Sequence, residues 1–150
     1  MRRKLIATTL VAGLATVAVA HASSGGGSAP QWATVNTCSP TAVGVRASLP
    51  GDGSSGQMRV RFTAQWYSPS RGWAPVNGVP SSPWLDAGSG QYSYGQTGWT
   101  FDFDQPKPGS HPQIRAVVEM QWPGGRSATQ VTQAGASGVD VGGSQASCTL

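Results

Sequence analysis

The sequence predicts an all-β fold, namely a single antiparallel β-sandwich of about seven to eight strands. Short segments in which apolar and polar residues alternate recur along the chain, and clusters of Gly, Pro, Ser and Asp separate them. The 150 residues include 21 glycines, and no window after the N-terminal segment repeats apolar residues at helical spacing over three turns. Short strands with Gly and Pro between them are typical of a sandwich or a barrel, and the chain length favours one sandwich.

Alternation is clearest from Gln57 to Tyr67. The even positions from Met58 to Trp66 are apolar, while most odd positions carry arginine, threonine or glutamine. Successive side chains of a strand point to opposite faces of the sheet, so the even positions are expected to face the core. This segment therefore predicts a long strand with one buried face and one solvated face.

Two more segments show the same period of two. Trp99–Asp104 places Trp99, Phe101 and Phe103 on one face, and Gln113–Trp122 alternates in the same way. Weaker alternation predicts five shorter strands, at Gln31–Cys38, Val43–Leu49, Gly72–Val76, Ser127–Gln133 and Ala146–Thr149.

The first 22 residues have the three parts of a secretory signal peptide. Met1–Lys4 is cationic, Leu5–Ala20 is apolar, and Ala20–Ala22 is a small-x-small cleavage site. We expect cleavage of residues 1–22 rather than their retention, and hence export of the chain. Residues 23–30 then form a flexible Gly- and Ser-rich leader, and residues 31–150 form the sandwich domain.

Removing the signal peptide removes most of the net positive charge. The whole chain has ten Lys and Arg against six Asp and Glu, and three of the basic residues lie at positions 2–4. Seven basic and six acidic residues remain, a formal charge of +1, so the charge predicts no binding to nucleic acid. Because no other apolar run approaches the ~18 residues of a membrane helix, we expect no membrane contact after cleavage.

Cys38 and Cys148 are the two cysteines of the chain. An exported protein meets an oxidising compartment, so these thiols are expected to form a disulfide with each other. In the chain-entropy model, closing a loop of about 110 residues stabilises the fold by about 4 to 5 kcal/mol. A dimer linked through one cysteine of each copy is the alternative. Two distant cysteines and His111 are too few ligands for a metal site, so no metal or other cofactor is expected.

Two regions of the chain follow the pattern of a known kind of sandwich. Trp99–Phe103, Pro108–Ser110 and Ile114–Val118 resemble the E strand, the following corner and the F strand of immunoglobulin-like and fibronectin type III-like sandwiches. Arg59–Tyr67 and Trp73–Val76 resemble the C strand and its hairpin partner. The Ala-, Gly- and Val-rich composition is similar to that of uncharacterised exported immunoglobulin-like proteins of actinobacteria. The resemblance implies an immunoglobulin-like fold, but no activity and no functional residues.

The chain departs from antibody-type domains in two respects. Its cysteines lie near the ends of the predicted domain rather than on central strands, so we expect them to join the first strand to the tail. His111 and Pro112 stand where a tyrosine would make the corner hydrogen bond. That hydrogen bond is therefore expected to be missing or replaced.

No arrangement of residues in the sequence predicts catalysis. His111 lies beside Ser110 in a predicted turn, whereas a nucleophile and its base are brought together by the fold rather than by adjacency. Asp102 and Asp104 are predicted on one strand face about 6 to 7 Å apart, which suits two-carboxylate hydrolysis or a calcium ion. Outward polar residues of an alternating strand usually form a solvated face, so we expect that the protein is not an enzyme.

Aromatic residues give the one indication of a small ligand. Alternation assigns three of the six tryptophans to the core, at positions 66, 99 and 122, and leaves Trp32 unassigned along with two others, Trp73 and Trp84. Together with Tyr92 and Tyr94, these two are the candidate ligand-contact residues, because flat rings are able to stack on sugars. The alternative is that the tryptophans close the ends of the sandwich and the tyrosines line a loop.

Arg59, Arg61 and Arg115 are predicted on solvated strand faces. If their strands are neighbours they form one cationic stripe, which attracts an anionic wall polymer or a partner. The alternative is a solvated face on which Glu119 is a cross-strand partner of an arginine.

Taken together, these features predict a secreted, non-catalytic binding or structural module that works outside the cell or at the cell wall. Its partner is expected to be a protein or a cell-wall glycan, and the alternative function is a carbohydrate-binding module with an exposed aromatic platform. We expect a monomer, with pairing of exposed edge strands as the route to a homodimer.

Overall fold

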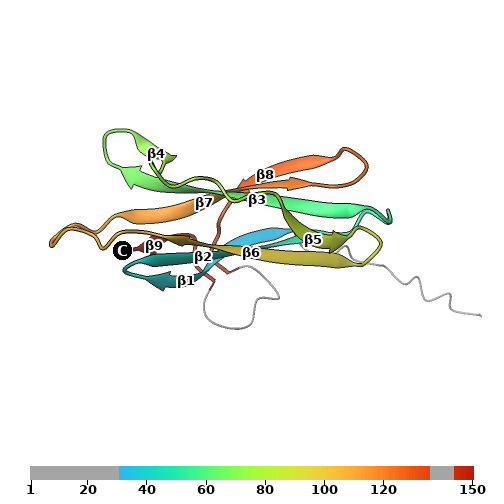
Figure 1. Cartoon of the computed structure of the whole chain (residues 1–150), viewed down its shortest axis with the longest axis horizontal. Helices are drawn as coiled ribbons and strands as arrows, with labels where there is room; N and C mark the ends of the chain where they lie inside the picture. The colour runs from blue at the N-terminus through green and yellow to red at the C-terminus, as the bar shows by residue number, and fades with distance from the viewer. Residues whose placement is uncertain (1–30, 136–143) are drawn as a thin grey trace, which may run out of the picture.

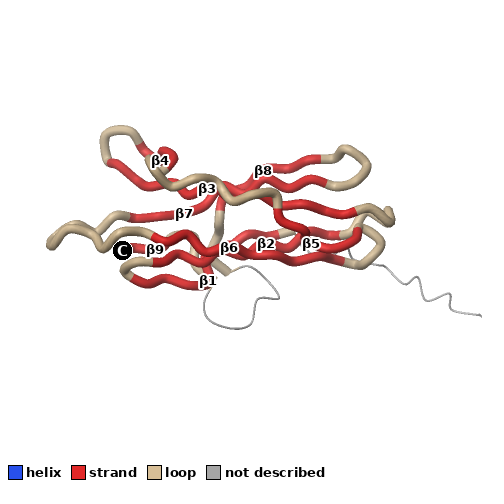
Figure 2. Tube along the Cα trace, viewed as in Figure 1, coloured by secondary structure: helices blue, strands red, loops and turns tan. Residues whose placement is uncertain are grey.

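The computed structural model describes residues 31–135 and 144–150, which contain nine strands and no helix. All of the strand pairings are antiparallel, and loops connect the strands throughout (Figure 2). The predicted signal peptide, residues 1–22, and the predicted leader, residues 23–30, lie outside the described residues. Within the described ranges, no helix has the length and hydropathy needed to cross a membrane.

The strands form two layers that lie face to face (Figure 1). One layer has three strands in the order β1-β2-β6, which are β1 (Trp32–Ser39), β2 (Ala42–Pro50) and β6 (Tyr94–Asp102). Strand β2 is the centre of this layer and pairs with β6 over nine residues without a register shift. The outer edge of β6 has no strand paired to it in the described part of the chain.

The other layer is built around the pair of β3 and β7. Its six strands are β3 (Gln57–Ser68), β4 (Gly72–Pro75), β5 (Leu85–Ser89), β7 (Gln113–Gln121), β8 (Ser127–Val131) and β9 (Cys148–Thr149). Strands β4 and β5 pair with the two ends of β3. They share one edge of β3 because β7 occupies the other, and β8 and β9 share the free edge of β7 in the same way.

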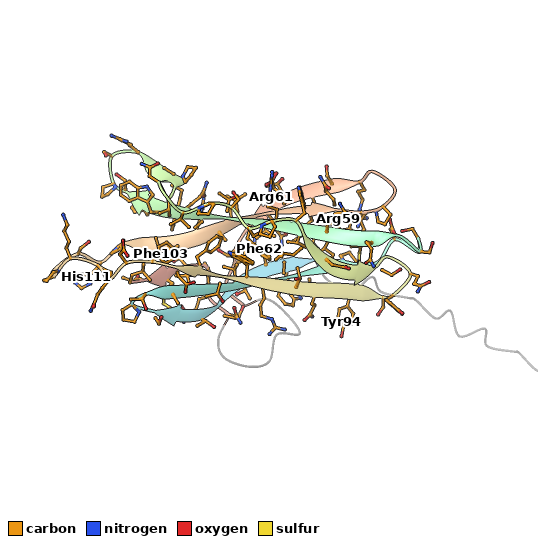
Figure 3. All side chains as sticks on the ribbon, viewed as in Figure 1. Arg59, Arg61, Phe62, Tyr94, Phe103 and His111 are labelled. Atoms are coloured by element: carbon orange, nitrogen blue, oxygen red, sulfur yellow. A yellow bond between two sulfur atoms is a disulfide. The ribbon has the colours of Figure 1, made fainter. Side chains whose placement is uncertain are left out.

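The apolar faces of the two layers meet in one core. The even positions of β3 from Met58 to Ala64 are buried, and Figure 3 shows Phe62 pointing between the layers. Val45 and Leu49 of β2 are buried on the facing layer. Complete burial of such a side chain stabilises the fold by about 1.5 to 3 kcal/mol relative to leaving it exposed. The prediction of an all-β sandwich with alternating core positions is confirmed.

The disulfide predicted between Cys38 and Cys148 is confirmed, and it joins the two layers. Cys38 lies on β1 and Cys148 on β9, with their Cα atoms 5.4 Å apart and 110 residues apart in the chain. No free cysteine remains among the described residues. The bridge thus holds the first strand to the tail, as expected from the positions of the two cysteines.

Strand β6 differs from its prediction at both ends. It begins at Tyr94, five residues before the predicted start, because β2 supplies backbone partners as far as Pro50. Gly95 and Gly98 interrupt the apolar pattern there, so alternation gives no signal for this half of the strand. The strand ends at Asp102, and the prediction that Asp104 shares a strand face with Asp102 is therefore wrong.

Strand β5 was not predicted, and one tryptophan is more buried than alternation suggested. Leu85–Ser89 has only two apolar residues and an aspartate typical of turns, yet Val60 and Arg59 of β3 pair with it. Trp32 was left out of the core but is only 7% exposed. The tail contacts the same strand, since Gln145 pairs with Val35. Contacts with a distant segment are invisible to local alternation.

Candidate functional site

The outward face of the six-stranded layer carries long charged and aromatic side chains. Arg59 and Arg61 point away from the other layer in Figure 3, on the opposite side of β3 from Phe62. Strand β7 pairs with β3, and this pairing places Glu119 opposite Arg61 and Arg115 opposite Gln65. Arg59, Arg61 and Arg115 therefore lie on neighbouring strands, which was the condition for a shared arginine stripe.

One stack on this face consists of Trp84, Arg61 and Glu119. Arg61 Nε and a terminal guanidinium nitrogen donate to the two carboxylate oxygens of Glu119 at 2.8 and 3.0 Å. The guanidinium carbon lies 4.9 Å from the centroid of the Trp84 ring. The hydrogen bonds to Glu119 raise the pKa of Arg61 above its ordinary value. The predicted cross-strand pairing with Glu119 is confirmed, and it holds Arg61 beside the tryptophan.

A second stack lies further along β3 and consists of Arg115, Trp73 and Tyr67. Arg115 Nε donates to Gln65 Oε1 at 2.9 Å, and its guanidinium carbon lies 4.3 Å from the centroid of the Trp73 ring. The Trp73 and Tyr67 rings are 5.4 Å apart and tilted by 57°. Partial burial lowers the pKa of Arg115, because desolvation disfavours the charged form. An arginine nevertheless keeps its charge at neutral pH.

Small neutral side chains separate the two stacks. Thr63 lies between them on β3, within hydrogen-bond distance of the Ser81 hydroxyl at 2.7 Å and opposite Val117 of β7. Arg61 and Tyr67 are six positions apart, which is about 20 Å along the strand. We call the outward surface formed by these two stacks the stacked face, and its members are Arg61, Tyr67, Trp73, Trp84, Arg115 and Glu119.

The structure brings two of the four candidate aromatic residues together on one face and places the other two elsewhere. Trp73 and Trp84 both lie on the stacked face. Tyr94 belongs to β6 and points away from the core on the outer side of the other layer (Figure 3). Tyr92 lies in the turn before it, and both tyrosines are more than half exposed. The fold therefore does not bring the four rings together in a single platform.

A groove that local sequence patterns did not predict lies at the end of the sandwich where β3 ends and β7 begins. It has a volume of about 720 Å³, and we call it the end groove. Asp102, Asp104 and Ser110 line it together with apolar residues, whereas His111 does not. Phe103 also lines the groove, and Figure 3 shows His111 further out, at the tip of the β6–β7 loop.

The stacked face offers arginine and tryptophan side chains for recognition. In the described ranges, no three His, Cys, Asp or Glu residues gather as a metal site would require. The amide of Ser110 donates to the carbonyl of Lys107 at 2.9 Å, and among the described residues no hydrogen bond joins Ser110 to His111. Arginine and tryptophan fixed on a rigid sheet are instead the residues that dominate the energy of many protein interfaces.

Comparison of the chain with protein-family models, with curated proteins and with solved structures found no match. The geometry of the stacked face and the end groove is therefore the basis for assigning a function. Local sequence patterns indicated the arginines and tryptophans of the stacked face separately. The pairing of β3 with β7 and β4 then brought them together.

Proposed function

We propose that this chain is an exported immunoglobulin-like module that binds a protein partner through the stacked face and performs no catalysis. The arrangement of strands supports the immunoglobulin-like part of the proposal. The segment that resembles an E strand lies on β6 in one layer, and those that resemble C and F strands are the paired β3 and β7 of the other. This distribution over two layers is the one that the resemblance requires.

The observation that carries the binding proposal is the pair of arginine and tryptophan stacks. Each arginine is held over a tryptophan ring and by a further hydrogen bond, to Glu119 for Arg61 and to Gln65 for Arg115. Side chains that are already fixed lose less conformational entropy when a partner covers them. Tryptophan, tyrosine and arginine are also enriched among the residues that contribute most to interface affinity.

The disulfide supports the extracellular part of the proposal, because such bonds persist in oxidising compartments. The test is the intact mass of the secreted protein, measured with and without reduction and thiol alkylation. We expect a chain that begins at Ser23 and is alkylated at two cysteines only after reduction. A retained signal peptide, free thiols or a covalent dimer contradicts this part.

Site-specific photo-crosslinking tests the binding surface. A photoreactive phenylalanine analogue replaces Val117, between the two stacks, and in a control protein it replaces Tyr92, in the exposed turn before β6. Both proteins are irradiated with the culture medium and envelope of the producing cells. We expect a defined protein adduct from position 117 that is lost with Trp84→Ala, and none from position 92. Adducts from both positions, or from position 92 alone, contradict the proposal.

A carbohydrate-binding module is the second candidate, because Trp73 and Trp84 lie on the same outward face. Its test is the tryptophan fluorescence of the whole protein during titration with a panel of soluble polysaccharides. A saturable shift that is lost in Trp73→Ala would favour the glycan over a protein partner. Constant fluorescence across the panel would remove this candidate.

A further inference from the structure

The end groove is a second surface, separate from the stacked face. Its volume of about 720 Å³ lies within the range of sites that bind small ligands. Its floor is apolar, since Trp66, Phe103 and Ile114 line the groove and also pack with the core. The groove is therefore an extension of the hydrophobic core that opens to solvent.

The walls of the end groove are fixed by the backbone of several distant segments. Backbone hydrogen bonds hold them, from Val76 N to Ala64 O (3.0 Å), from Phe103 N to Thr41 O (2.8 Å) and from Leu150 N to Pro112 O (3.0 Å). The disulfide at Cys148 also ties the last of these segments to β1. A preformed groove of this kind needs little ordering when it is occupied, so more of the contact energy appears as affinity.

The rim of the end groove is negatively charged. Asp102 and Asp104 line it and are exposed, and no Lys, Arg or His is among the lining residues. The single ion pair among the described residues joins Arg61 to Glu119 on the other side of the layer. Neither aspartate of the groove therefore has a salt-bridge partner within the described ranges, and the field at the rim favours a cation.

An open strand edge leads into the groove. The amide of Phe103 donates to Thr41 and the carbonyl of Ser93 accepts from Gly51, so the odd residues of β6 turn their backbone groups toward β2. In an antiparallel pair these directions alternate, and the even residues from Gln96 to Asp102 turn theirs to the outer edge. No strand pairs with that edge in the described part of the chain. Such an edge is a template for an added strand.

We propose that the outer edge of β6 and the end groove together bind an extended peptide segment of a protein partner, in which a basic residue is flanked by apolar residues. The backbone of the peptide pairs with Gly98 and Thr100. Its apolar side chains enter the groove, and its ammonium or guanidinium group lies between Asp102 and Asp104. This site is independent of the stacked face, so either surface is able to bind without the other.

Titration of the ¹⁵N-labelled full-length mature protein with three capped peptides tests the proposal. The peptides are Ac-Leu-Lys-Leu-NH2, its Gln analogue, and the Lys peptide with methylated backbone amides. We expect saturable shifts of the Trp66 indole N–H and of the Gly98 and Thr100 amides with the Lys peptide, and no shift of the Trp84 indole. The Gln peptide is expected to bind about threefold to tenfold more weakly, and the methylated peptide weaker still.

Charge variants of the groove give the matched control. Asp102→Asn combined with Asp104→Asn is expected to weaken the binding of the Lys peptide by about threefold to tenfold and to leave the binding of the Gln peptide unchanged. Asp86→Asn removes an exposed carboxylate outside the groove and should have no effect. Equal binding of the Lys and Gln peptides overturns the cation preference, and undiminished binding of the methylated peptide overturns pairing with β6. If position 117 gives no photo-crosslinked protein adduct while peptide binding is unchanged, only the proposed binding through the stacked face is contradicted.

Discussion

The outward faces of the two layers differ although their inward faces are built alike. On the six-stranded layer the outward positions hold the two arginine and tryptophan stacks. On the three-stranded layer several outward positions are glycines or small polar residues, and at Gly98 a Cβ atom would lie 2.7 Å from the carbonyl oxygen of Val45. The outward face of one layer thus accommodates the long side chains of the two stacks, whereas on the other layer the backbone leaves no space for a side chain at position 98.

The difference between the two outward faces shows that burial constrains only the inward-facing residues of each strand. Inward positions of both layers must be apolar and closely packed, because they share one core. Outward positions are not constrained by packing in the core. On the six-stranded layer, outward residues hold Arg61 and Arg115 in fixed positions.

The largest effect is expected from the disulfide that holds the two layers together. Replacing Cys38 and Cys148 by serine should lower the free energy of unfolding by about 4 to 5 kcal/mol, because the unfolded chain gains the freedom of a 110-residue loop. Urea denaturation of the variant and of the wild type, each with and without reductant, measures the change. Reductant should destabilise only the wild type, and an unchanged midpoint in the variant would contradict this account.

The restricted outward face should respond to an added side chain. Gly98→Val places a branched side chain against the Val45 carbonyl, and we expect a loss of about 1 to 3 kcal/mol in the free energy of unfolding. Thr100→Ala on the same strand face is the control, with an expected change within about 0.5 kcal/mol. Thermal and urea unfolding report both values. Equal stability of the two variants would show that β6 accommodates a side chain at position 98, and would contradict this expectation.

A smaller effect is expected on the stacked face. Glu119→Gln removes the ion pair with Arg61, whose two side chains are 38% and 36% exposed, so solvent already screens much of the attraction. The variant should be slightly less stable than the wild type at low salt and equal to it at high salt. The same substitution should make the fluorescence of Trp84 more sensitive to quenching, because Arg61 is no longer held beside the ring. A salt-independent loss would indicate a packing role instead.

The smallest effect concerns acid sensitivity of the turn between the layers. Hydrogen bonds from the Ser54 hydroxyl and amide lower the pKa of Asp52 below its ordinary value of 3.8. A lowered pKa in the folded state contributes stability above the pKa of the unfolded chain, and this contribution is lost as the pH falls through the folded value. Asp52→Asn should therefore reduce the dependence of stability on pH below about 4. An unchanged acid profile would exclude this group as a contributor.

The sequence predicted the central strands better than the edges. The pairing partners β3 and β7 alternate over at least nine residues, so their patterns stand out from the neighbouring loops. Strand β5 and the first half of β6 have too few apolar residues for such a signal, and their extended form depends on backbone partners from β3 and β2. Composition and period therefore describe a strand well only where its own side chains form the core.

The candidate sites show the same limit. The types of residue on the stacked face were visible in the sequence, and Glu119 was expected as a partner on a neighbouring strand. The stacking of Trp84 on Arg61 and of Trp73 on Arg115 follows from the pairing of β3 with its neighbours, which joins positions more than 20 residues apart. The end groove draws its walls from five segments, so no local pattern contains it.

The sequence by itself determined the all-β class, the buried half of the main strands and the pairing of the two cysteines. These follow from local alternation, from turn-forming residues and from the presence of only two thiols. Only the three-dimensional arrangement shows which outward residues meet, which edge of β6 has no paired strand among the described residues, and where the core opens into a groove. The physical reason is that burial is encoded residue by residue along a strand, whereas contacts between strands depend on register and on which layer each strand joins.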